Sequence, residues 1–203
     1  MLFDDTLIKD FWQWFESVSK DLLNYADNKK IIDELDVRTA QLGRFDWEIG
    51  PLGEATYFAI SPNLNPEKLM LTQKIIDLAP TLSQWIFLPS KPAKHDWKGI
   101  FKMKNQWGKE ILVDCSSWQY ILYQFEDNTF DADVLISGVD GDNDTRNMAV
   151  DIAITGYLGE EYFLQTIQNV KVLESFYPQN FGTATSLQHL KKHIESVDRK
   201  KQY

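Results

Sequence analysis

Four aspartates with regular spacing are the first residues in this sequence that could bind a cation. Asp140, Asp142, Asp144 and Asp151 occupy positions 1, 3, 5 and 12 of a calcium-loop spacing, and carboxylate oxygens at such intervals are the ligands that a hard cation needs. Position 6 is Thr145, where calcium loops carry glycine, and position 12 is the shorter aspartate. The alternative, which these departures favour, is a helix N-cap with acids that the helix dipole stabilises. We therefore expect no metal, with Asp140, Asp142 and Asp144 as the candidate ligands should one bind.

Asp151 is the main candidate for acid–base chemistry, because it lies inside the apolar segment 148–158. An isolated buried carboxylate is costly, so Asp151 must either face solvent or have a hydrogen-bonding or charged partner. Carboxylates with a perturbed pKa mark functional sites, and Glu160 is the natural second member of a catalytic pair. The alternative is a structural hydrogen bond from a neighbouring Trp, Tyr or Arg.

For three smaller groups of residues, a structural role is the alternative to a catalytic or metal-binding one. His189 and His193, at i and i+4 of a predicted helix, could chelate zinc, but no third ligand is evident and both fit as polar residues beside an apolar stripe. His95-Asp96 could form an acid–base pair or a simple turn. Cys115 ends a predicted strand, where a buried and inert thiol is usual. The sequence has no nucleophile elbow and no phosphate-binding glycine loop, so we expect no cofactor.

Seven tryptophans give the chain a large aromatic content. Most of these rings are expected in the core, where each buried indole N–H needs an acceptor. Some could instead line a partner-binding surface, since tryptophan is a common anchor in interfaces. The candidates for binding are Trp12, Trp47 and Trp85.

Charge and cysteine content exclude some classes of function. The net charge of −9 argues against nucleic acid as a partner, which needs clustered Lys and Arg. A single cysteine rules out an intrachain disulfide and favours a reducing compartment. The first residues lack the basic and apolar regions of a signal peptide, and no apolar run is long enough to cross a membrane. We therefore expect a cytoplasmic protein with no membrane association.

The change of hydrophobic period along the chain predicts which elements position these residues. Two β-β-α-β units, 45–92 and 118–173, follow a helical segment over 1–43 and are separated by a hairpin over 97–115; a last helix covers 184–198. In the second unit, the helix spans 145–158 and the closing strand spans 162–169, with a possible continuation to 173. We expect a single α+β domain, 1–203, with one mixed, mostly antiparallel sheet and helices packed on it.

Three segments occur in a recognisable order: FWQWF (Phe11–Phe15), TYFAISPN followed by LAPTLSQWIF (Leu78–Phe87), and TGYLGEEYF (Thr155–Phe163). Together they resemble a family of small, uncharacterised bacterial proteins with an aromatic N-terminal helix, an AP-x-L-x-x-W block and a late helix ending in D-x-L-L-G-E. Here 155–157 departs from the D-x-L portion. The resemblance covers about residues 10–170 and implies a bacterial origin and one α+β domain. It implies no activity and no site residues.

These observations leave two hypotheses about function. The first is a non-enzymatic, cytoplasmic module that binds or regulates another protein, motivated by an acidic and aromatic-rich chain without a catalytic motif. The alternative is a small-molecule-binding or hydrolase-like site that uses the carboxylates of Asp151 and Glu160. The oligomeric state stays open.

Overall fold

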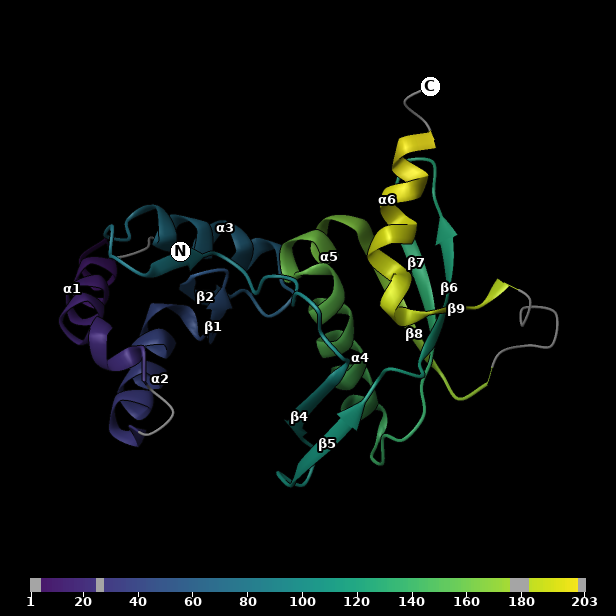
Figure 1. The fold of residues 1–203 in the computed structure, drawn as a ribbon, viewed down its shortest axis with the longest axis horizontal. Helices are drawn as coiled ribbons and strands as arrows, with labels where there is room; N and C mark the ends of the chain where they lie inside the picture. Colours follow the sequence, from purple (N-terminus) through teal and green to yellow (C-terminus); the bar gives the residue numbers. More distant parts are fainter. Residues whose placement is uncertain (1–4, 25–27, 176–182, 201–203) are drawn as a thin grey trace. The chain divides into compact units, whose positions relative to one another are not determined.

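The computed structural model describes residues 5–24, 28–175 and 183–200 (Figure 1). These residues form helices and three separate β-sheets with mixed strand orientation, which confirms the α+β class. The chain divides into two compact units, Met1–Lys91 (unit 1) and Pro92–Tyr203 (unit 2), where the sequence analysis expects one domain. Each unit contains one of the two predicted β-β-α-β units. In the described residues, no helix combines the length and the apolar character needed to cross a membrane.

Unit 1 consists of two helices followed by a β-β-α-β unit. Its elements are α1 (Asp5–Leu22), α2 (Lys29–Gly43), β1 (Asp46–Leu52), β2 (Ala55–Ser61), α3 (Pro66–Asp77) and β3 (Trp85–Leu88). The strands lie in the order β1-β2-β3, with β1 antiparallel and β3 parallel to β2. The parallel pair is joined through α3, as a parallel connection requires.

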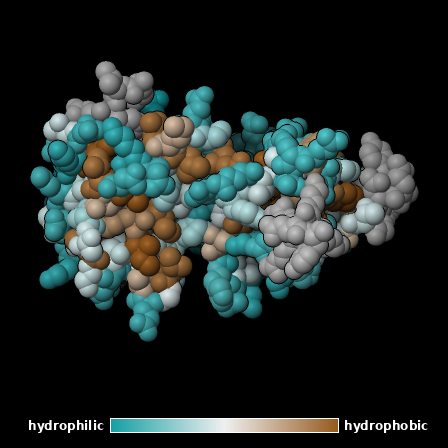
Figure 2. Space-filling view, turned by 90° about the horizontal axis from the view of Figure 1, so that it is seen from above, coloured by the Kyte–Doolittle hydropathy of each residue, from teal (hydrophilic) through white to brown (hydrophobic). Residues whose placement is uncertain are grey.

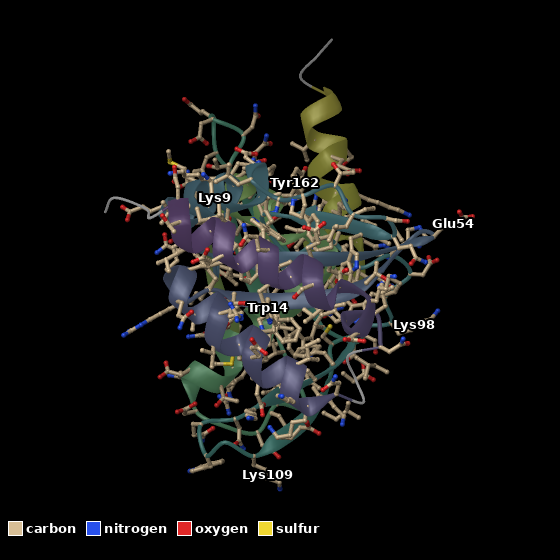
Figure 3. All side chains as sticks on the ribbon, turned by 90° about the vertical axis from the view of Figure 1, so that its left-hand side faces the viewer. Lys9, Trp14, Glu54, Lys98, Lys109 and Tyr162 are labelled. Carbon is tan, nitrogen blue, oxygen red and sulfur yellow. The ribbon has the colours of Figure 1, made fainter. Side chains whose placement is uncertain are left out.

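The apolar stripe of α1 forms the core of unit 1. Its residues at three- and four-residue steps are buried, as an amphipathic helix predicts. The ring of Phe15 lies 4.9 Å from that of Phe58 and 5.1 Å from that of Trp85, measured between centroids. The guanidinium carbon of Arg38 in α2 lies 4.8 Å from the centroid of Trp14 in α1. Figure 3 labels Trp14 where these two helices run side by side. Aromatic packing therefore joins both helices and the sheet.

Unit 2 contains a two-stranded hairpin and a four-stranded sheet. Its elements are β4 (Ile100–Lys104), β5 (Glu110–Asp114), β6 (Gln119–Gln124), β7 (Phe130–Leu135), α4 (Asn143–Leu158), α5 (Glu160–Thr166), β8 (Ile167–Leu173), β9 (Thr185–Ser186), the 3₁₀ helix η3 (Leu187–His189) and α6 (Leu190–Lys200). The hairpin pairs β4 with β5. The larger sheet has the order β8-β7-β6-β9, in which only β7 and β8 are parallel.

The single sheet expected from the sequence is replaced by three sheets. The hydrophobic pattern along the sequence predicts where each strand lies in the chain, but it does not predict which other strand pairs with it. After β3 the chain passes Pro89 and Pro92, which lack the N–H needed to continue a ladder. The strands of unit 2 then pair among themselves, and β9 pairs with β6 at one edge of their sheet.

The predicted strand 162–169 is wrong in its first half. Gly159, with a φ of 83°, ends α4, and a second helix, α5, begins at Glu160. Glu160 and Glu161 fall in the first turn of this helix, where the helix dipole favours negative charge. The strand begins only at Ile167 and runs through Leu173. The predicted last helix also begins later, at Leu190, because 185–186 pair with β6 as β9 and 187–189 form a 3₁₀ turn.

Candidate functional site

The aspartate-rich loop before α4 contains the N-cap of that helix. The carboxylate of Asp142 accepts a hydrogen bond from the backbone N–H of Thr145 at 2.9 Å, and this bond lowers the pKa of Asp142 below its usual value. Asp140 and Asp144 are exposed. Across the described parts of the chain, no group of three or more His, Cys, Asp or Glu residues is placed to hold a metal ion. Of these acids, Asp142 is thus accounted for by helix capping.

The two candidate catalytic carboxylates lie on different helices. Asp151 is half-buried on α4, and its burial raises the pKa of the carboxyl group to about 6. Glu160 is buried in the first turn of α5, beyond the bend at Gly159. Neither residue lines either of the two pockets described below. Asp151 therefore combines a raised carboxyl pKa with a position outside these two pockets.

Two of the three candidate tryptophans belong to the core of unit 1. The indole N–H of Trp12 donates to the carbonyl of Ile75 at 2.8 Å, and that of Trp85 donates to the carbonyl of Ser19 at 3.3 Å. Both rings are buried in the aromatic cluster. Trp47 of β1 is only half-buried, and its N–H donates to the carboxylate of Asp36 at 2.6 Å. Of the three, Trp47 alone lines one of the two pockets described below.

The Trp47 pocket is an open depression of about 550 Å³ between α2 and β1. It is lined by Asp36, Ala40, Arg44, Phe45, Asp46, Trp47 and Lys91. Arg44 ends α2 with a φ of 55°, in the left-handed region where helices more often place glycine. Two cationic and two anionic side chains around an indole suit a small molecule that carries both charges better than a simple ion.

The remaining polar candidates have structural partners. The hydroxyl of Tyr120 lies 2.8 Å from Nδ1 of His193, whereas Nε2 of His189 lies 3.5 Å from the side-chain amide of Gln188. The two histidines thus contact different residues instead of converging. His95 and Asp96 form an exposed pair at 2.8 Å.

Cys115 is buried against Tyr157, with 3.9 Å between its sulfur and the phenolic oxygen. Burial raises the pKa of the Cys115 thiol. A thiol with a raised pKa carries little thiolate near neutral pH, so it is a poor nucleophile.

The tip of hairpin β4–β5 is a candidate surface that the sequence analysis missed. Trp107, in the turn between the two strands, has 75% of its surface exposed. Ile100 and Leu112 on the strands are 50% and 67% exposed. A signal was present in the sequence, since this tryptophan lies near the middle of the predicted hairpin 97–115, beside Gly108, and apolar residues occur on both faces of the strands. We call Ile100, Lys102, Lys104, Trp107 and Leu112 the hairpin surface.

A second pocket of about 440 Å³, the β8 groove, lies between α4 and β8 in unit 2. Its lining residues are Asn143, Arg146, Asn147 and the five consecutive residues 170–174. The guanidinium of Arg146 forms an ion pair with the carboxylate of Glu174. This groove combines one polar helix face with one strand, whose lining residues include valine and leucine as well as Lys171.

Comparison with known proteins assigns no relative to this chain. No family model, no curated protein and no solved structure matches it. The resemblance to the uncharacterised bacterial family therefore stays a prediction, and the function has to be argued from the residues of this chain.

Proposed function

We propose that this protein is a non-enzymatic protein-binding module whose partner contacts the hairpin surface, with Trp107 as the anchor residue. The observation that carries the proposal is an indole that is 75% exposed on a turn fixed by hydrogen bonds. Leaving a large aromatic side chain in water is unfavourable, and aromatic anchors of this kind supply much of the binding energy in interfaces.

The turn that carries Trp107 is held in place from both sides. The side-chain oxygen of Asn105 accepts from the backbone N–H groups of Trp107 and Lys109 at 3.1 and 3.0 Å. The hydroxyl of Thr145 in α4 donates to the side-chain oxygen of Gln106 at 2.6 Å and accepts from its backbone N–H at 3.2 Å. A pre-ordered loop loses little conformational entropy on binding, which favours affinity.

The strands of the hairpin present apolar residues on the side that faces solvent. In the antiparallel register, Lys102 lies opposite Leu112, and Ile100 shares their face because side chains alternate along a strand. The inner face is formed by the buried residues Phe101, Met103 and Val113. An outer face with two exposed aliphatic side chains is more apolar than solvation alone would favour.

The charges around Trp107 favour one kind of partner surface. Lys102, Lys104 and Lys109 outnumber Glu110 and Asp114 in the hairpin, although the whole chain has a net charge of −9. A locally basic rim favours an acidic rim on the partner. We therefore propose a partner with an apolar pocket for the indole, surrounded by Asp and Glu. Figure 3 shows Lys109 at the outer end of the hairpin.

The cytoplasm is the proposed location, because the single cysteine suits a reducing compartment. The alternative function, a hydrolase-like site at Asp151 and Glu160, would need a cavity that contains both carboxylates. The raised pKa of Asp151 is the feature that favours it.

The test compares proteins captured by the wild type, by Trp107→Ala and by a matched control. Unit 1 also exposes hydrophobic residues, seen as brown surface at the left of Figure 2. Among the exposed side chains of unit 1, Met70 of α3 is 77% exposed, so Met70→Ala removes a comparable exposed group far from the hairpin in sequence. Capture from native extract followed by mass spectrometry identifies the partners.

The expected result is a partner retained by the wild type and by Met70→Ala and lost with Trp107→Ala. For that purified partner, Trp107→Ala should weaken binding at least about tenfold in titration calorimetry, and Lys104→Glu should slow association at low salt. Identical captures by the wild type and Trp107→Ala would contradict the proposal.

A further inference from the structure

The β8 strand has an open edge in the described structure. β8 is hydrogen-bonded to β7 and stands at the end of the strand order β8-β7-β6-β9. It is seven residues long and contains one charged residue, Lys171. Edge strands present unpaired backbone groups and are usually short, charged or covered. β8 is long and mostly uncharged, so its edge is well suited to pair with another strand.

The backbone groups that face this edge can be identified from one hydrogen bond. The N–H of Ile136 donates to the carbonyl of Leu173 at 3.1 Å, so the carbonyl of Leu173 points toward the β7 side. Along a strand, the N–H and C=O groups of alternate residues point to opposite sides. The register from Asp131↔Asn169 to Leu135↔Leu173 is regular. The N–H and C=O groups of Val170 and Val172 therefore face away from β7, toward the open edge.

The β8 groove runs along this edge. Residues 170–173 of β8 and Glu174 just beyond it all line the groove, and four consecutive strand residues include side chains of both faces. A pocket on one face of the sheet would be lined by alternate residues only. Asn143, Arg146 and Asn147 of α4 form the opposite wall. A groove between an edge strand and a helix is the geometry in which extended peptides add to a sheet.

The charge of the groove selects the kind of peptide. Arg146 and Lys171 line it with a single acid, Glu174, in a chain whose net charge is −9. The Glu174 side chain is exposed, so its ion pair with Arg146 is of the weak, surface kind. A carboxylate of a bound peptide can replace it and form a bidentate pair with the guanidinium. The amides of Asn143 and Asn147 can hydrogen-bond to the same peptide.

We propose that the β8 groove binds an extended acidic peptide segment of another protein as an added strand. Its backbone pairs with Val170 and Val172, and its carboxylates contact Arg146 and Lys171. This site is separate from the hairpin surface and does not depend on Trp107.

The first test uses a defined probe, an acetylated and amidated peptide of about seven residues in which valine and aspartate alternate. The amide signals of residues 170–174 should shift on titration in NMR spectra. The same peptide with lysine in place of aspartate should bind at least about tenfold more weakly. Equal binding of the two peptides, or no binding of the acidic one at millimolar concentration, would overturn the proposal.

A backbone scan of the probe tests strand addition on the wild-type protein. Each peptide residue is N-methylated in turn, which removes one N–H donor. If the peptide pairs with β8, binding should be lost at every second position and retained at the positions between, because alternate N–H groups face the partner strand. Uniform sensitivity or uniform tolerance along the peptide would contradict pairing with β8.

Protein variants locate the site. Arg146→Gln should weaken binding of the acidic peptide about tenfold. Arg38→Gln is the matched control, because Arg38 is also a half-buried helical arginine that is ion-paired with a glutamate. Trp107→Ala should leave peptide binding unchanged, which separates this site from the hairpin surface. A peptide that binds Arg146→Gln as tightly as the wild type would place the site elsewhere.

Discussion

The phenolic oxygen of Tyr120 lies 2.8 Å from Nδ1 of His193, and this contact joins the sheet of unit 2 to α6. The two residues are 73 positions apart in the chain. Tyr120 is buried, and burial raises the pKa of its hydroxyl to about 12. The buried hydroxyl therefore stays protonated well above the pH at which an exposed tyrosine ionises.

The raised pKa of Tyr120 predicts a loss of stability in strong base. The hydroxyl has a pKa of 10.0 when solvated and about 12 in the fold, so the unfolded chain releases its proton first as the pH rises. The free energy of unfolding should fall from about pH 10 to pH 12, by about 2 kcal/mol from this group. Denaturant titrations at several pH values measure this fall. Tyr120→Phe should reduce it, and an unchanged pH slope in that variant would contradict the prediction.

Asp151→Asn should stabilise the protein near neutral pH. The carboxyl pKa rises from 3.8 to about 6 in the fold, so ionisation is less favourable there than in the unfolded chain. The contribution of Asp151 to the free energy of unfolding is greatest below pH 4, falls between about pH 4 and 6, and is constant above about pH 6. The neutral amide avoids that loss and should raise the free energy of unfolding by roughly 1 to 2 kcal/mol at pH 7.

The gain from Asp151→Asn should disappear when the pH is lowered to 4, where the wild-type carboxyl is itself neutral. Asp144→Asn, on an exposed position of the same helix, is the control and should change stability little. A destabilised Asp151→Asn at pH 7 would show that the ionised carboxylate makes a favourable interaction.

The elements most accurately predicted from the sequence are those that local chemistry determines. Asn65 and Pro66 predict the start of α3, and Asn65 caps it by accepting from the N–H groups of Glu67 and Lys68. The stripe of α1 likewise predicts its buried face. Residues 162–166 are misread because a short run of aromatic and aliphatic residues fits a strand and a buried helix alike.

Features that depend on distant residues could not be predicted. Strand partners, the open edge of β8 and the division into two units follow from long-range pairing, which a local period does not encode. For the same reason, the sequence did not show that the indole of Trp47 stays half-buried beside a pocket while that of Trp85 is buried in the core.

The capping role of Asp142 predicts a pH-dependent loss in Asp142→Ala. Its pKa is lowered by the backbone hydrogen bond from Thr145, so the stabilisation is present above the ordinary value of 3.8 and is lost as the pH falls below it. Near neutral pH the alanine variant should melt a few degrees lower than the wild type, whereas Asp142→Asn, which can still cap, should not. At pH 3 the difference in melting temperature between Asp142→Ala and the wild type should be smaller. Equal melting of all three proteins at pH 7 would exclude the cap as a stabilising contact.

Gly156→Ala should destabilise the protein, although alanine is the better helix former. An ideal Cβ at position 156 of α4 would lie 2.2 Å from Cζ3 of Trp97, and the two nearest further atoms belong to the same ring. The indole is held by a ring contact with Tyr157 at 4.9 Å between centroids, so it cannot move away freely. Propensity favours alanine by about 1 kcal/mol, but overpacking typically costs 1 to 3 kcal/mol. We expect a net loss of about 1 kcal/mol.

A double-mutant cycle identifies the cause. In a Trp97→Ala background the space beside position 156 is open, so adding Gly156→Ala should be neutral or stabilising there. The free energies of unfolding of the four proteins, taken from denaturant titrations, give the coupling between the two positions. If Gly156→Ala destabilises both backgrounds equally, the close approach of the indole is not the reason for glycine at this position.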